Sequence, residues 1–212
     1  CITSGDTTSL YILKVFKEYE NYSTDENAGS GELGDVTSSK SIDAIDYTEA
    51  MEYLETVSWN YLAIPGIADT DTSTVATWVK SLNDTLDKKV IAVLPKVDGD
   101  HYAIVNFASD NIVVAGNNTP YSTADYCARI AGLLAGTPMT ISATYAPLNE
   151  VVSFDYLKKD EMNTAINAGK FILYNDGEKV KVARAVTSFV TTTDTKNDSF
   201  KNRSYCSCRY RS

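Results

Sequence analysis

Along most of the chain, stretches with helical spacing of apolar residues alternate with short continuous apolar runs. Four stretches repeat apolar residues every three or four positions, which predicts amphipathic helices at 46–57, 72–86, 122–136 and around 162–166. The apolar runs predict strands at 60–64, 90–94, 103–107, 112–115, 150–154, 171–174 and 180–186. The pattern therefore predicts an α/β domain over residues 41–190, with a mixed, largely parallel central sheet and helices on both faces.

Polar and glycine residues mark several boundaries of these elements. Asp46 followed by Glu49 resembles a capping box, and Ser122 with Asp125 three residues later predicts a second helix start. Gly169 stands where a helix C-cap belongs. The sequence Asn-Asp-Gly-Glu at 175–178, between two apolar runs, predicts a β-hairpin. The strands 60–64 and 90–94 with the helix between them predict a parallel βαβ unit.

The N-terminal part of the chain is less regular. Residues 10–16 could form one strand, and the polar, glycine-containing stretch 21–34 predicts a loop or linker. We therefore treat residues 1–40 as an irregular, partial N-terminal segment and linker. The chain starts at Cys1 without a methionine or a signal peptide, and we interpret it as a fragment or a processed piece.

Composition and charge exclude two classes of partner. The 212 residues include 19 Lys and Arg against 28 Asp and Glu, a formal charge of −9. Such an acidic chain is not expected to bind nucleic acid or an anionic membrane surface non-specifically. No apolar run approaches the roughly 18–20 residues that span a bilayer. The last twelve residues depart from the acidic balance, with four bases (Lys201, Arg203, Arg209 and Arg211) and no acid.

Candidate ligand motifs fall short of the patterns that they resemble. The stretch 34–41 resembles a phosphate-binding loop, but Ser39 stands where that loop needs glycine before the lysine. The stretch 69–73 opens like a calcium loop, but Thr74 and Lys80 occupy the positions of its glycine and glutamate. We interpret the two aspartates of that stretch as acids at a helix N-terminus.

The remaining chemically distinctive residues also favour structural interpretations. His101 is the only histidine and is interpreted as a surface turn residue, and Cys127 as a buried small apolar residue. Cys206 and Cys208 have no second pair for a closed zinc site. Gly132 and Gly136 predict close packing of their helix against a neighbour. We predict no catalytic residue, no cofactor-binding residue and no metal site.

A set of short motifs nevertheless follows a distinctive order over about 150 residues. These motifs are the Tyr-x-x-Ala-x-x-x-Leu-Glu at 47–55, the Asn-Tyr-Leu-Ala-Ile-Pro-Gly at 60–66, Val-Ile-Ala-Val-Leu-Pro at 90–95, Val105-Asn106, the helix 126–136 with the trailing 142–144, Ala-Ile-Asn-Ala-Gly at 165–169 entering 171–173, and 182–188. In this order they resemble the tail sheath protein of contractile-tailed bacteriophages and prophages.

The resemblance implies a structural role. Sheath subunits form hexameric rings around the tail tube protein, contact baseplate and tail terminator proteins, and contract to drive the tube through the host envelope. The implied location is the virion tail, assembled in the bacterial host cytoplasm. In the family, extended arms add strands to a sheet in neighbouring subunits. No catalytic residue or cofactor is implied.

The resemblance changes at the end of the chain. Residues 194–201 still fit the family, which then continues into a further domain, whereas 202–212 are polar and basic. We therefore expect residues 191–212 to be a connector towards a missing C-terminal domain. The expected subunit-connector residues are Phe189, Val190, Phe200 and Lys201. Without that domain we expect a monomer or a small non-helical oligomer.

Two alternatives stay open at this point. A phage-tail-like bacteriocin would give the same sequence pattern as a phage. A flavodoxin-like or nucleotide-binding α/β enzyme would need ligand-contacting loops at the carboxyl ends of its strands. Those ends carry Pro65 and Pro95, which have no backbone N–H to donate.

Overall fold

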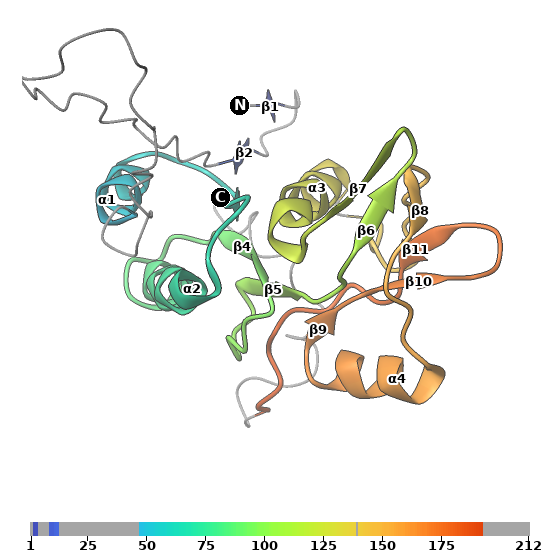
Figure 1. The fold of residues 1–212 in the computed structure, drawn as a ribbon. Coiled ribbons are helices and arrows are strands. Elements are labelled where there is room, and N and C mark those ends of the chain that lie inside the picture. Colours follow the sequence, from blue (N-terminus) through green and yellow to red (C-terminus); the bar gives the residue numbers. More distant parts are fainter. Residues whose placement is uncertain (1, 4–8, 13–46, 139, 193–212) are drawn as a thin grey trace, which may run out of the picture.

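The computed structural model describes residues 2–3, 9–12, 47–138 and 140–192, and its centre is a six-stranded sheet (Figure 1). The strand order is β1-β2-β3-β4-β5-β9, and every neighbouring pair is parallel except β1 with β2. The bounds are β1 Ile2–Thr3, β2 Ser9–Ile12, β3 Tyr61–Ala63, β4 Ile91–Pro95, β5 Ile104–Phe107 and β9 Lys170–Phe171. The predicted mixed, largely parallel sheet is confirmed.

Helices cover both faces of this sheet, as predicted. They are α1 Thr48–Thr56, α2 Asp69–Asp84, α3 Thr123–Gly136 and α4 Lys159–Asn167. Side chains alternate along each strand, so β4 sends Ala92 and Leu94 into the core cluster that includes α1 and α2 residues. Ile91 and Val93 point the other way, into the cluster that includes α3 residues. The β3-α2-β4 segment is the predicted parallel βαβ unit.

Two small antiparallel sheets extend the core on the α3 side (Figure 1). One contains β6 Ile112–Val114, β7 Asn117–Tyr121 and β8 Val151–Ser153, and the other is the hairpin of β10 Leu173–Asn175 with β11 Val180–Val182. The hairpin predicted around 175–178 is confirmed. Phe171, however, belongs to β9 in the central sheet and not to the hairpin. The predicted strand 171–174 is therefore two strands that pair in different sheets.

Several predicted boundaries agree with the structure. The Ser122 hydroxyl accepts a hydrogen bond from the Asp125 N–H at the start of α3. Gly169 follows the C-cap of α4 with φ of +72°, the left-handed conformation that glycine adopts without strain. Helix α1 has Tyr47 at its N-cap, and the predicted capping residue Asp46 lies outside the described residues, as do residues 13–16 of the predicted first strand.

Two predictions about helix residues are wrong. Helix α2 starts at Asp69, three residues earlier than predicted, and ends at Asp84, so Leu86 lies beyond it and is 50% exposed. Gly136 was expected to allow close packing, but a Cβ added there would meet no atom within 4 Å. The acids Asp69 and Asp71 do lie in the first turn of α2, as expected. Among the described residues, no helix has the length and apolarity to cross a membrane.

Candidate functional site

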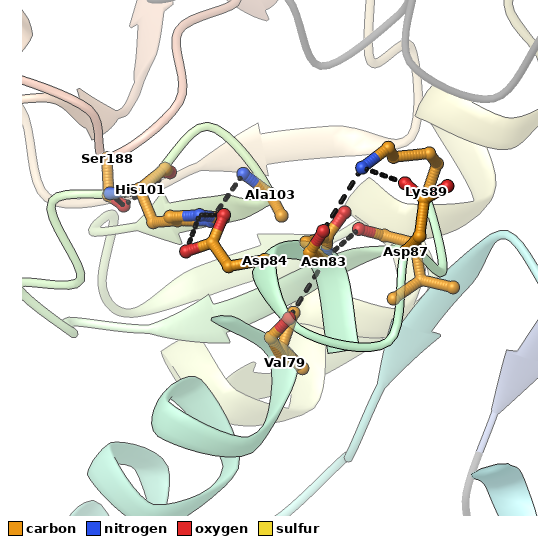
Figure 2. Close-up of polar contacts among 9 residues, drawn as sticks. Val79, Asn83, Asp84, Asp87, Lys89, His101, Ala103 and Ser188 are labelled. Carbon is orange, nitrogen blue, oxygen red and sulfur yellow. Dashed lines mark hydrogen bonds and ion pairs between the residues drawn. The ribbon is translucent and has the colours of Figure 1, made fainter. Parts of the chain in front are cut away.

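The end of the described chain is fixed to the turn between β4 and β5. The Ser188 hydroxyl accepts a hydrogen bond from the His101 N–H at 3.2 Å and donates one to the His101 carbonyl at 3.0 Å (Figure 2). The Ser188 N–H donates to the Ile104 carbonyl at 2.8 Å. We call residues 98–101 together with Ser188 the exit clamp, because they hold the chain near the end of its described part.

His101 is a structural part of this clamp and not the surface residue that we predicted. Its Nδ1 accepts a hydrogen bond from the Ala103 N–H at 3.1 Å, which assigns the ring proton to Nε2. Nε2 lies 3.3 Å from both carboxylate oxygens of Asp84 at the end of α2 (Figure 2). The residue is only 5% exposed. Since both ring nitrogens already have partners, His101 is poorly placed to act as a general base.

The end of α2, which carries Asp84, is fixed to the start of β4 by Asn83. Asn83 is buried, and its side-chain amide donates to the Val79 carbonyl inside the helix and to the Val90 carbonyl, both at 3.0 Å (Figure 2). The second bond ties α2 to the start of β4. A buried, hydrogen-bonded amide is costly to disrupt, so the adjacent Asp84 carboxylate is held in position below the His101 ring.

The chain beyond Ser188 is held by Asp100. One carboxylate oxygen, Oδ1, accepts hydrogen bonds from the Val190 N–H at 2.7 Å and the Thr191 N–H at 2.9 Å. The structure thus places the two predicted connector residues within its described part differently: Phe189 is 5% exposed, whereas Val190 is 37% exposed. Phe200 and Lys201 lie outside the described residues. The described chain is therefore buried from Ala185 to Phe189 and exposed from Val190 to Thr192.

The Asp100 contacts should make the exit clamp sensitive to acid. Partial desolvation acts to raise the pKa of Asp100, but hydrogen bonds from Thr191 and Val190 outweigh it and lower the pKa below the ordinary 3.8. A lowered pKa means that the clamp gains stability from this group above about pH 4 and loses it as the pH falls through the folded-state pKa. We expect amide protection factors at Val190 and Thr191 to fall in that range, and to be low at every pH in Asp100→Ala.

Sequence reasoning missed this clamp because its parts are 87 residues apart in the chain. Neither Asp100 nor Ser188 has a local signal beyond a turn-like composition. Another contact without a sequence signal joins Tyr126 and Arg129 of α3 to Glu150, whose Oε1 lies 3.0 Å from the Tyr126 hydroxyl and 2.7 Å from Arg129 Nε. Desolvation and the nearby Glu150 charge raise the pKa of Tyr126, so this tyrosine stays a neutral hydrogen-bond donor.

A groove of about 620 Å³ lies beside α4, at the carboxyl ends of β4, β5 and β9. Ala108, Leu157, Thr164, Ala165, Ala168 and Ile172 supply its apolar and neutral lining, and Lys96, Asp98, Asp110, Asp160, Glu161 and Lys170 its charges. We call it the α4 groove. Asp160 and Glu161 also occupy the first turn of α4, so its positive N-terminal end is already matched by acids.

These contacts give no support to a nucleotide-binding enzyme. Phosphates favour basic side chains and open helix N-termini, whereas the α4 groove carries four carboxylates against two lysines. One of those lysines, Lys96, is already paired with Asp110 at 2.6 Å. Within the described ranges, no three His, Cys, Asp or Glu side chains gather in the manner of a metal site. Cys127 is buried as predicted, and desolvation raises its pKa, which keeps the thiol protonated and unreactive.

Comparison with known proteins supports the tail sheath interpretation and gives no support to the enzyme. The model of the phage tail sheath protein central domain matches residues 40–188, which end at the exit clamp. The chain belongs to the phage tail sheath protein family. The curated tail sheath protein of Clostridium phage phiCD119 is 35% identical over 153 residues, 72% of this chain and 42% of that protein. The chain therefore spans less than half the length of this sheath protein.

Solved structures show the same fold. The sheath tail protein from Desulfitobacterium hafniense aligns with a TM-score of 0.71 at 23% identity, over 79% of this chain and 40% of that one. The helical sheath of the anti-feeding prophage in its contracted state aligns with a TM-score of 0.54 at 12% identity, over 74% of this chain and 47% of that one. The predicted resemblance to tail sheath proteins is confirmed.

Proposed function

We propose that this phage tail sheath family chain is a structural subunit that polymerises around a tail tube and contracts to drive the tube through the host envelope. The match of the sheath central domain model over residues 40–188 carries the proposal. The fold shared with a helical sheath in its contracted state supports the contractile part. The partners are copies of the chain in hexameric rings, the tail tube protein, and baseplate and tail terminator proteins.

The contacts of the exit clamp support the proposed organisation of the chain. Residues 1–40 are a partial N-terminal segment and linker, 41–190 the sheath core domain, and 191–212 a connector towards a further domain. Just before this connector, Phe189 is buried and holds the chain to the core, whereas Val190 is exposed. A pull on the connector would reach the central sheet by two routes. Asp100 of the β4–β5 turn binds the Val190 and Thr191 N–H groups, and Ser188 binds His101 and Ile104. Phe200 and Lys201 continue the connector, and the subunit acts in the virion tail after assembly in the host cytoplasm.

A chimaera tests the proposed function. Residues 40–188 would replace the matching region of the Clostridium phage phiCD119 tail sheath protein, which supplies the parts that lie outside this chain. If the domain is a sheath subunit core, the chimaera should form tubular polymers that electron microscopy detects, since both proteins belong to the same family.

The unmodified phage protein is the positive control, and the same protein without its matching region is the negative control. A chimaera that is folded by circular dichroism but forms no tubes would contradict the proposal. Tubes formed by the negative control would show that the central domain is not needed for polymerisation.

A further inference from the structure

The α4 groove has the features of a docking site. Its apolar lining includes the buried Ile172 and the part-exposed Leu157 at 39%. Helix α4 forms one wall of the groove. None of its residues is buried, so the side of the helix that lines the groove is partly exposed. Apolar surface of this kind gains free energy when a partner covers it.

The charges of the α4 groove specify a basic occupant. Lys96 and Asp110 neutralise each other at 2.6 Å, and the remaining groups are Asp98, Asp160 and Glu161 against Lys170. In the part of the chain that the structure describes, neither Asp98 nor Asp160 has an ion-pair partner. A basic segment that also carries aromatic side chains would match both the acidic rim and the apolar lining.

The C-terminal part of this chain has that composition. Residues 200–212 contain four bases, three aromatic residues (Phe200, Tyr205 and Tyr210) and no acid. The exit clamp adjoins the groove, because Asp100 accepts hydrogen bonds from the Val190 and Thr191 N–H groups and Asp98, two residues earlier, lines the groove. The nine residues from Thr192 to Phe200 can span up to about 30 Å.

We propose that the basic segment 200–212 docks into the α4 groove of its own chain. The apolar lining takes the aromatic side chains, and the rim carboxylates pair with the bases. The docking is independent of polymerisation, since it needs only one copy of the chain. It places the end of this chain over the carboxyl edge of the central sheet, where it covers the inner face of α4.

Native cysteines allow a direct test in the full chain. Cys206 and Cys208 lie in the proposed segment, and Thr164 is an exposed residue that lines the groove. In a Cys1→Ser background, we expect the thiol of Thr164→Cys to form an intramolecular disulfide with Cys206 or Cys208 under mild oxidation, detected by peptide mass spectrometry. The matched control is Asn163→Cys, the preceding residue of α4, which is exposed but does not line the groove.

Docking should raise the rate of disulfide formation about tenfold or more for Thr164→Cys over Asn163→Cys, because it raises the local concentration of one thiol beside the other. Adding Asp160→Lys to Thr164→Cys should lower the rate severalfold, although a nearby lysine alone would make a thiol more reactive. Glu178→Lys, in the exposed β10–β11 turn, should leave the rate unchanged. Equal rates for Thr164→Cys and Asn163→Cys, no effect of Asp160→Lys, or disulfides found only in covalent dimers would each overturn the proposal.

Discussion

Replacing Phe107 by alanine should lower the free energy of unfolding by about 3–5 kcal/mol, one of the largest single effects in this domain. Phe107 is fully buried at the end of β5. Its ring lies 6.0 Å from that of Tyr126 on α3 and 6.3 Å from that of Phe171 on β9. Removing it would leave a cavity between α3 and the strands β5 and β9, which are paired with each other at Phe107 and Phe171, so the site cannot collapse easily.

Urea unfolding followed by circular dichroism measures this change as a shift of the midpoint at constant slope. Tyr53→Ala is the control, because Tyr53 is 66% exposed on α1 and its loss should change the free energy of unfolding by no more than about 0.5 kcal/mol. A decrease of less than about 1 kcal/mol in the free energy of unfolding for Phe107→Ala would contradict the packing of Phe107 between β5, β9 and α3, since removal of a buried phenylalanine ring usually destabilises a protein by more than that.

Local sequence patterns predicted most elements between residues 47 and 192, but not β7, which has no continuous apolar run. Continuous apolar runs identified β3, β4 and β5 because both faces of these strands are covered by helices. The Ser122 cap and the Asp176-Gly177 turn were predictable because both act within four residues. The order of these motifs also pointed to the sheath family, which no single motif would have done.

The features that the sequence did not predict depend on contacts between residues far apart in the chain. His101 resembles a surface turn residue in sequence, and only the approach of Asp84 and Ser188 from other elements buries it. Phe171 and Leu173 share one apolar run, but Phe171 pairs with β5 and Leu173 pairs with β11. The α4 groove has no sequence signal, because its lining comes from residues as far apart as Lys96 and Ile172. Pairing choices of this kind are set by tertiary packing and not by local preference.

Replacing Gly169 by alanine should lower the free energy of unfolding by about 2–4 kcal/mol, through strain and collision together. Gly169 has φ of +72°, which any residue with a Cβ adopts at a cost. That Cβ would also lie 2.9 Å from the carbonyl oxygen of Ser188 and 3.0 Å from its carbonyl carbon and Cα. These are backbone atoms, and Ser188 is fixed by its bonds to His101 and Ile104, so neither partner can rotate away.

Gly116→Ala separates the two causes, because Gly116 has a similar φ of +85° but no atom within 4 Å of an added Cβ. It should cost only the strain of the left-handed conformation, about 1–2 kcal/mol. The collision should also loosen the exit clamp, so Gly169→Ala should lower amide protection at Val190 and Thr191 while Gly116→Ala leaves it unchanged. If both variants lower the free energy of unfolding equally and show equal amide protection at Val190 and Thr191, the backbone of Ser188 moves away from the added Cβ without a measurable energetic penalty. The exit clamp would then not be the rigid attachment through which a sheath connector could pull on the central sheet.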